Sequence, residues 1–466
     1  MVFSSMTFLY YFLPVVLLVY LVAPRQVKNL VLLLASLFFY AWGEPRYILL
    51  MGVTVLIGYA SALVIGRYRD KIQAKIVFIL ALFCCLALLG IFKYADFFIS
   101  SFGKATGMSV GLLKLALPIG ISFYTFQLVS YIVDVYRGKV KAQKNPITLF
   151  TYVVMFPQLI AGPIVRYEDV EQDLADRKHS IPMIREGISR FVIGLGKKVL
   201  IANQLGELAD LYTKVTENSV AFAWVCAVAA ALQIYFDFSG YSDMAIGLGK
   251  IFGFSFPENF DYPYMSRSIT EFWRRWHMTL GGWFRDYVYI PMGGSRVKSG
   301  RLIFNLLVVW MLTGLWHGAS WNFVLWGLFF GILLIIEKLF ILKYIQEAKG
   351  ISHIYVIFAV VISFVIFSSD NMNYAGHMLA DMFGMGGLNG ITKETLYYIV
   401  SYGFTLFVAI MGATPLVKHI ATRAMRVAEK YKLDTVLESV VLALILILST
   451  SHIVDGSFNP FLYFRF

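Results

Sequence analysis

The chain has 466 residues, of which 59% are hydrophobic and only 15% are charged. Soluble domains carry roughly 25% charged residues, so a disordered protein, a disulfide scaffold and an ordinary water-soluble enzyme are excluded. The composition predicts an all-α polytopic membrane protein with about 11–13 transmembrane or re-entrant helices. The net charge of +12 is interpreted as Lys and Arg in cytoplasmic loops that attract anionic lipid headgroups, and not as a nucleic-acid site. A basic site for an acidic ligand or carrier is the alternative.

Apolar runs recur along the whole chain, and no Lys or Arg precedes the first of them. Because a signal peptide needs a positive region ahead of its apolar stretch, we expect a retained first span. Several runs are short or contain Gly and Pro, so some are expected to be tilted, re-entrant or interfacial. The runs lie at about 6–23, 29–43, 47–66, 74–92, 112–135, 147–165, 188–202, 218–238, 302–319, 321–342, 354–369, 395–417 and 436–453.

The loops between these runs alternate in charge. Those after the first, third and fifth runs are rich in Lys and Arg, and those after the second and fourth are poorer. Basic loops face the cytoplasm, which predicts an N-terminus outside. The polar segment 163–190 is expected to be an aqueous loop that is helical in part. The three cysteines lie in apolar runs without the spacing of a disulfide framework, and no metal site is predicted.

The stretch 233–330 departs from the spacing of spans and loops. Between Arg267 and Arg301 it holds seven Lys or Arg and two acids, interleaved with tryptophans. Polar irregular backbone survives at membrane depth only inside protein or along a water-filled cavity. The stretch therefore predicts a cavity or a funnel on the cytoplasmic face. The chain is treated as one membrane domain, 1–466, with this core and an aromatic tail at 454–466.

His317 is the first candidate for chemistry, because long uncharged segments flank it on both sides. An ionisable residue at membrane depth costs about 2.5–3.5 kcal/mol, so it is a functional candidate by default. The flanking Gly314 and Gly318 would let another chain or a substrate approach closely. The alternative is a histidine that only hydrogen-bonds between helices.

His277 follows Arg274 and Arg275 in the sequence TEFWRRWHMTL. Burial and nearby cations would both keep its imidazole neutral. It is expected to be either a second polar group on the donor side of the cavity or an interfacial histidine in a belt of Trp and Arg.

Acids near the aromatic run YFDFSGYSDM are expected to pair with the Arg267–Arg285 cluster. The candidate lining of a substrate or donor channel comprises Tyr235, Asp237, Tyr241, Asp243, Asn259, Arg274, Arg275, Trp276 and Trp316.

The chain ends in the aromatic sequence FNPFLYFRF, which contains Tyr463. This ending is interpreted either as an aromatic anchor at the membrane interface or as an acyl carrier. Phenolate is a better leaving group than an alkoxide, so a tyrosyl ester would be an activated acyl group.

Seven segments, in chain order, resemble the membrane-bound O-acyltransferase family, and within it the bacterial alginate O-acetyltransferase branch. They are MVFSS at the start and the segments 117–138, 156–167, 235–249, 258–280, 285–296 and 314–327. Among them are the sequences RRWH, with His277, and WHG, with His317. The resemblance runs over nearly the whole chain, and the ordered set is far more specific than any single motif.

The resemblance implies a ring of membrane helices around a thinned core, with funnels on both faces. It implies that His317 is catalytic and that His277 is a second functional residue nearer the donor. The acyl donor would be cytoplasmic acetyl-CoA or a carrier-bound thioester, with no bound cofactor. The acceptor would be an extracytoplasmic polysaccharide, and the setting a bacterial inner membrane. Tyr463 would carry the acyl group, and a secreted or membrane-anchored partner of the SGNH hydrolase type would complete the transfer.

Three alternatives to acetyl transfer stay open at this point. D-alanyl or other acyl transfer to a cell-wall polymer fits the same motifs, although the aromatic ending resembles the acetylating branch. A transporter or flippase would also use intramembrane acids and histidines, but many transporters have paired repeats, and the stretch 233–330 has no counterpart elsewhere in the chain. A scaffold that anchors a secreted transferase would tolerate substitutions at His317 and Tyr463.

Overall fold

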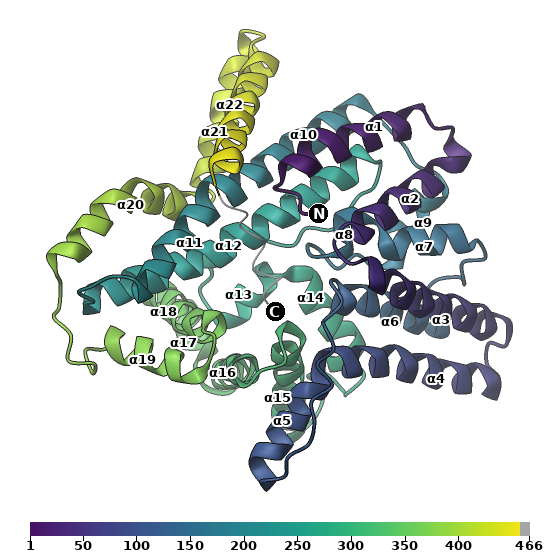
Figure 1. The fold of residues 1–466 in the computed structure, drawn as a ribbon, viewed down its shortest axis with the longest axis horizontal. Coiled ribbons are helices and arrows are strands. Elements are labelled where there is room, and N and C mark those ends of the chain that lie inside the picture. Colours follow the sequence, from purple (N-terminus) through teal and green to yellow (C-terminus); the bar gives the residue numbers. More distant parts are fainter. Residues whose placement is uncertain (457–466) are drawn as a thin grey trace. The chain divides into compact units, whose positions relative to one another are not determined.

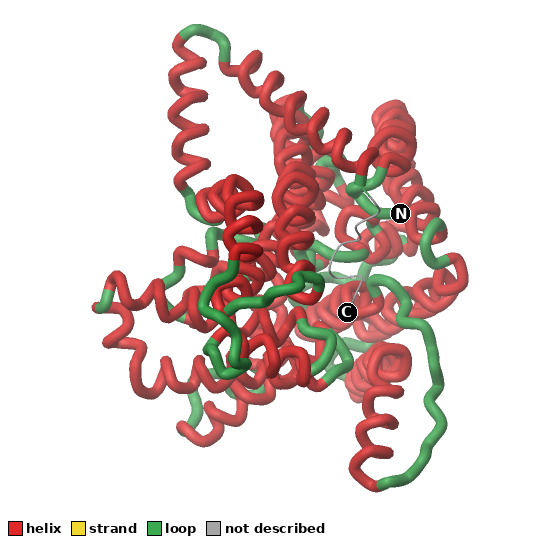
Figure 2. Tube along the Cα trace, turned by 60° about the vertical axis from the view of Figure 1, so that its left-hand side comes forward, coloured by secondary structure: helices red, strands yellow, loops and turns green. Residues whose placement is uncertain are grey.

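A computed structural model describes residues 1–456, except for the side chains of Gln346 and Lys349. The described part is built from helices joined by loops, as the red and green tube of Figure 2 shows. The chain forms two compact units. The first unit comprises Met1–Phe191 and Met244–Pro257, and the second comprises Val192–Asp243 and the chain from Glu258 onward. The all-α architecture predicted from composition is confirmed over these residues.

The first unit contains the N-terminal helices, shown in purple and blue in Figure 1. Short π or 3-10 turns join several of them. The helices are η1 (Thr7–Phe12), α1 (Leu13–Val22), η2 (Arg25–Val27), α2 (Lys28–Ala41), η3 (Pro45–Tyr47), α3 (Ile48–Arg67), α4 (Ile72–Leu89), η4 (Gly90–Tyr94), α5 (Ala95–Thr106), α6 (Ile121–Arg137), α7 (Pro146–Val154), α8 (Phe156–Leu159), α9 (Tyr167–Ala175) and the first part of α10 (Ile181–Gly196).

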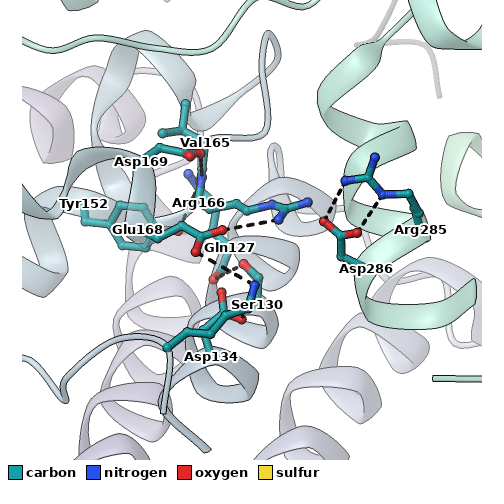
Figure 3. A network of polar contacts seen from close by, with 11 residues as sticks. Gln127, Ser130, Asp134, Tyr152, Val165, Arg166, Glu168, Asp169, Arg285 and Asp286 are labelled. Atoms are coloured by element: carbon teal, nitrogen blue, oxygen red, sulfur yellow. Dashed lines mark hydrogen bonds and ion pairs between the residues drawn. The ribbon is translucent and has the colours of Figure 1, made fainter. Parts of the chain in front are cut away.

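A cluster of phenylalanine rings forms one part of the core of this unit. Phe8 of η1 packs on Phe39 of α2 and on Phe156 of α8, with ring centroids 5.9 and 6.1 Å apart. The segment 163–190 contains α9, so the expected partial helix is confirmed. Its first turn is fixed by Arg166, whose backbone N–H donates to the Asp169 carboxylate at 2.9 Å and whose guanidinium reaches Glu168 at 3.4 Å (Figure 3).

The second unit holds the remaining helices. They are η5 (Lys197–Ala202), α11 (Asn203–Asp210), η6 (Leu211–Thr213), most of α12 (Val220–Ile251), η7 (Pro263–Met265), α13 (Ile269–Arg275), α14 (Met278–Phe284), η8 (Arg285–Tyr289), α15 (Ser299–His317), α16 (Trp321–Ile336), η9 (Glu337–Ile341), α17 (Leu342–Glu347), α18 (Lys349–Ser368), α19 (Met372–Met382), α20 (Lys393–Gly412), α21 (Leu416–Lys430) and α22 (Asp434–Asp455). The α21–α22 hairpin is yellow in Figure 1.

Close helix contact at glycines shapes the second unit. A side chain at Gly314 of α15 would collide with the Phe323 carbonyl of α16, and one at Gly327 of α16 would collide with the Trp310 carbonyl of α15. Small residues of this kind let membrane helices approach until their backbones touch. The backbone of α16 therefore packs directly against α15 near its end, where His317 lies.

Among residues 1–456, nine helices are long and apolar enough to cross a membrane. They are Arg25–Gly43, Pro45–Arg67, Ile72–Thr106, Val220–Ile251, Ser299–His317, Trp321–Ile345, Gly350–Ser368, Lys393–Gly412 and Asp434–Asp455, with Thr7–Val22 as a shorter apolar helix. The chain is a multi-pass membrane protein.

Two of the apolar runs found in the sequence form shorter or broken helices, and a third lies inside a longer helical stretch. In the run 112–135, Pro118 and the left-handed Gly120 (φ 75°) delay the helix until Ile121. The run 147–165 breaks at Met155, and the run 188–202 passes from α10 into the π-helical turn η5. Proline and glycine thus account for the late start of the first of these helices, and the turn at Met155 divides the second. The π-helical turn leaves the third run continuous, since α10, η5 and α11 follow one another without a gap.

Candidate active site

His317 is the last residue of α15 and is 6% exposed. Its imidazole is surrounded by the rings of Trp316, Trp326 and Phe367, with centroids 4.9, 5.0 and 5.2 Å away. The three rings meet the imidazole edge to face, the arrangement that aromatic pairs prefer. This aromatic cage, defined by these three rings, comes from α15, α16 and α18.

The space beside Gly314 and Gly318 is filled by the chain itself. A side chain at Gly318 would overlap the Phe323 ring, just as one at Gly314 would meet the Phe323 carbonyl. The close approach predicted from these glycines is therefore real, but α16 makes it rather than a substrate. The consequence is that α16 presents Trp326 to His317.

His277 lies in a two-residue break between α13 and α14. Trp276 is extended, and His277 adopts the left-handed conformation (φ 43°, ψ 53°), which is uncommon outside glycine but is less rare for asparagine, aspartate and histidine than for other residues. The backbone N–H of Met278 donates to the Asn259 carbonyl at 3.0 Å, and that of Asp261 donates to the Arg275 carbonyl at 3.0 Å. The segment 259–261 therefore holds the break in place on both sides.

A buried carboxylate fixes the start of α13. Glu337 in η9 is fully buried and accepts hydrogen bonds from the backbone N–H of Thr270 at 2.9 Å, from its hydroxyl at 2.7 Å and from the N–H of Ile269. The first N–H groups of a helix have no partner within the helix and favour a negative charge. Sequence reasoning missed Glu337, although an acid at the end of the apolar run LLIIE was a usable signal.

Asn259 sets the protonation of the His277 ring. Its side-chain oxygen accepts from the Thr279 hydroxyl at 2.9 Å and lies 3.0 Å from Nδ1 of His277, while its amide nitrogen donates to the Ser242 hydroxyl at 3.0 Å. Since that oxygen can only accept, Nδ1 of a neutral His277 carries the proton. Nε2 then presents a lone pair, and this buried atom has no hydrogen-bond partner within residues 1–456.

Burial keeps this imidazole neutral. His277 is 1% exposed and lies outside the nine candidate spans. Desolvation lowers its pKa from the usual 6.5 to about 3. The sequence predicted this direction, but burial alone is the cause, without a contribution from Arg274 or Arg275.

One face of α12 supplies the next layer of the site. Tyr235, Phe238 and Ser242 are spaced three and four residues apart and so lie on the same side of the helix. Phe238 packs edge to face on His277 at 4.7 Å, and Tyr235 lies 6.1 Å from Trp276 between ring centroids. Trp316 links the two histidines, because its ring is 5.7 Å from His277 and 4.9 Å from His317.

The acids of α12 point elsewhere, which corrects one prediction. Asp237 forms a buried ion pair with Lys198 at 2.5 Å, and Asp243 pairs with Lys197 at 2.7 Å. Both lysines belong to η5, not to the Arg267–Arg285 cluster that the sequence suggested. Residue 237 lies about 100° around the helix from residue 238, so it faces η5 while its neighbour faces His277. Tyr241 is buried on α12 as well.

The basic cluster is partly neutralised by local acids. Arg275 pairs with Glu271 at 2.9 Å and with Asp261 at 3.4 Å, and Arg285 pairs with Asp286 at 2.7 Å (Figure 3). Arg274 is exposed and makes no ion pair in the described part of the chain. Of the two arginines directly before Trp276 and His277, Arg274 is thus the one without an ion pair in the described residues, and its guanidinium is available to an anion.

The structure brings six of the predicted residues together: His317, His277, Asn259, Trp276, Trp316 and Tyr235. Asp237 and Asp243 turn to η5, and Tyr463 lies outside the described residues. Groups of His, Cys, Asp and Glu able to hold a metal ion are absent from the described part of the chain. The arrangement is a buried pair of histidines, one oriented by an amide and one caged by aromatic rings.

Comparison with known proteins identifies the family of the chain. A model described as the membrane-bound O-acyltransferase family matches residues 141–376. The chain is 38% identical to the probable alginate O-acetylase of Azotobacter vinelandii, with all of both chains covered. It is 34% identical to the peptidoglycan O-acetyltransferase of Helicobacter pylori, over 90% of this chain and 87% of that protein. It is 30% identical to the teichoic acid D-alanyltransferase of Bacillus subtilis, over 46% of this chain and 58% of that one.

The chain therefore belongs to the membrane-bound O-acyltransferase family. It is a membrane-bound enzyme that transfers acyl groups to hydroxyls, and the matched region contains the residues of the His277–His317 site. The resemblance noted in the sequence is confirmed.

Proposed function

We propose that this enzyme transfers an acetyl group from a cytoplasmic thioester, acetyl-CoA or a carrier-bound acyl group, to hydroxyls of an extracytoplasmic polysaccharide. The observation that carries the proposal is the full-length similarity to a probable alginate O-acetylase. The pair of buried histidines joined by Trp316 supports it. D-alanyl transfer has weaker support, since that similarity covers less than half of the chain. The protein would lie in a bacterial inner membrane with its N-terminus outside.

In the proposed reaction, His317 is the general base. Its imidazole takes the proton from the attacking hydroxyl as the oxygen bonds to the thioester carbonyl carbon. The C–S bond then breaks, and the sulfur leaves with the proton that His317 has held, so the products are an ester and a thiol. When Tyr463 is the first acceptor, the same step forms a tyrosyl ester, which a second transfer passes on with the help of an SGNH-type partner.

The carbonyl oxygen gains negative charge in this step and needs a donor. Nε1 of Trp326 is buried and makes no hydrogen bond within residues 1–456, and its ring lies against His317. Buried donors without partners are uncommon in native proteins. We assign this indole N–H to the oxyanion.

The donor side is assigned to His277 and Arg274. Nε2 of His277 is an acceptor oriented by Asn259, so it would receive a hydrogen bond from an N–H of the donor, or from the S–H of the thiol once the acyl group has left. The exposed and unpaired Arg274 guanidinium would attract the phosphates of a phosphate-bearing donor.

The test is mass spectrometry of acyl groups released by mild base from envelope polymers. Cells with the gene, without it, and with its His317→Ala form are compared. We expect acetate that is present only with the intact gene, and the polymer fraction that loses it identifies the acceptor. Released D-alanine with the same dependence would replace acetyl by D-alanyl transfer. Unchanged acyl content in all three strains would overturn the proposal.

A further inference from the structure

A second group of cations lies in the first unit, apart from the histidine site in sequence and in chemistry. Three side chains surround the ring of Tyr20, near the end of α1. Lys28 Nζ lies 4.5 Å from the ring centroid, Nη1 of Arg177 donates to the Tyr20 hydroxyl at 3.0 Å, and Nε2 of His179 lies 3.1 Å from that hydroxyl. We call these four residues the Tyr20 site.

Arg177 is a buried charge whose partners are all neutral. It is 9% exposed, its Nε donates to the Asp173 backbone carbonyl at 3.0 Å, and its guanidinium stacks on Phe254 at 4.4 Å. The Asp173 carboxylate is engaged elsewhere, by the backbone N–H of Ser255 at 3.0 Å. A buried charge without a counter-charge is costly, and proteins normally pair it. In the described residues, no carboxylate pairs with this guanidinium.

Lys28 adds a second cation without a counter-charge. Its ammonium group makes no hydrogen bond or ion pair within residues 1–456 and rests over the face of Tyr20. The nearby Asp176 is exposed and lies 3.9 Å from Arg25. Burial first, and then the charges of Lys28 and Arg177, lower the pKa of His179, as expected where the local potential is positive.

The position of the site indicates what kind of anion would meet it. Leu18, Leu21 and Val22 flank Tyr20 on α1 and are 65, 56 and 85% exposed. In a membrane protein, such side chains face lipid. Tyr20 itself is fully buried, and its hydroxyl donates to the Phe252 carbonyl at 2.6 Å. The site therefore combines a lipid-facing helix end with two cations that lack counter-charges.

We propose that the Tyr20 site binds a phosphate group, supplied by the headgroup of an anionic phospholipid. The oxygens of one phosphate can accept hydrogen bonds from a guanidinium and from an ammonium group together, and both bonds are charge-assisted. Half-buried His179 would stand beside the same anion. A water-soluble phosphate compound offers the same chemistry, and the experiment separates the two sources. The proposal does not depend on the acyl acceptor or on Tyr463.

The experiment uses the full chain, purified in a non-ionic detergent and stripped of lipid. Short-chain phosphatidylglycerol, phosphatidylcholine and inorganic phosphate are titrated separately, and binding is measured by native mass spectrometry and by the shift in unfolding temperature. Lys28→Gln removes a cation without removing any hydrogen bond of the fold, so it keeps the test valid when Arg177→Gln fails to fold. Lys71→Gln is the matched control, because Lys71 also lies near a tyrosine ring, at 5.9 Å, but is exposed.

We expect phosphatidylglycerol to bind more tightly than phosphatidylcholine, and Lys28→Gln to weaken it about tenfold, the loss of one charge-assisted hydrogen bond. Lys71→Gln should bind as the unaltered protein does. If millimolar inorganic phosphate displaces phosphatidylglycerol, the phosphate site is confirmed, but its ligand is a soluble phosphate compound and the assignment to a lipid headgroup is overturned. Equal binding of both lipids, or equal effects of Lys28→Gln and Lys71→Gln, would overturn the proposal.

Discussion

The two histidines of the site both touch Trp316, yet different forces hold them. His317 sits among three aromatic rings at the end of a helix, so the shape of the packing sets its orientation. His277 sits in a strained break and is oriented by the Asn259 amide. Substitutions that change the volume of a neighbouring side chain should therefore disturb His317, and substitutions that remove a neighbouring polar group should disturb His277. The predictions below exploit that contrast.

The largest expected effect is at His317. Replacement by alanine removes the proposed base, and the rate of acyl transfer should fall about 10²–10⁴-fold in reconstituted vesicles, with normal membrane insertion. His452→Ala is the control, since His452 is an exposed histidine near the end of α22. Equal rates for the two variants would remove His317 from the mechanism.

Trp326→Phe keeps most of the aromatic cage but removes its free indole N–H. Loss of one oxyanion donor costs about 10²-fold or more in kcat, so kcat should drop while the KM for the donor stays near its original value. Phe367→Leu changes the volume of the same cage without touching a polar atom. If Phe367→Leu proves as damaging to kcat as Trp326→Phe, the indole acts through packing alone.

Asn259→Ala frees the His277 ring to change tautomer. Loss of a group that orients a metal-binding histidine costs about 10–100-fold. We expect a loss of the same order here, with the KM for the donor rising along with the fall in kcat. Ser242→Ala removes only the hydroxyl that accepts from the Asn259 amide, so it should lower kcat less than Asn259→Ala does. A variant Asn259→Ala with the original kinetics would show that the tautomer does not matter.

Glu337→Gln tests the support of α13. Glutamine keeps one acceptor oxygen but loses the negative charge at the start of the helix, and stability should fall by about 1–3 kcal/mol. Thermal unfolding in detergent measures the loss. Glu347→Gln, at the exposed end of α17, should leave the unfolding temperature unchanged. Similar shifts in both variants would contradict a capping role for Glu337.

The smallest effect is on pH dependence. The pKa of His277 is about 3 in the folded protein and 6.5 in the unfolded chain. As the pH falls below 6.5, the unfolded chain therefore binds a proton at this residue that the folded protein does not bind. Stability should therefore decrease between pH 7.5 and pH 5.5 by about 1.4 kcal/mol from this group. In His277→Asn that part of the decrease should vanish. Parallel stability curves for the two proteins would mean that the imidazole is not desolvated.

The sequence predicted the helical membrane fold and the burial of His317, because an apolar composition and a histidine amid uncharged residues are local signals. It also suggested Asn259 as a lining residue. It placed Asp237 and Asp243 with the wrong cations, because the partner lysines of η5 lie about 40 residues earlier and only the packing of α12 brings them near. The role of Glu337 could not be predicted for the same reason, since its partners lie 67 and 68 residues away, although the acid itself stands out at the end of an apolar run.

The left-handed backbone at His277 also limits which amino acids evolution or an engineer can place there. Most side chains cost roughly 1–2 kcal/mol in this conformation, and β-branched ones are genuine outliers. Glycine, asparagine and aspartate are the accessible substitutes. A saturation library at this position should thus be enriched in these three among folded survivors, so alanine scanning alone would confuse a strained backbone with lost chemistry.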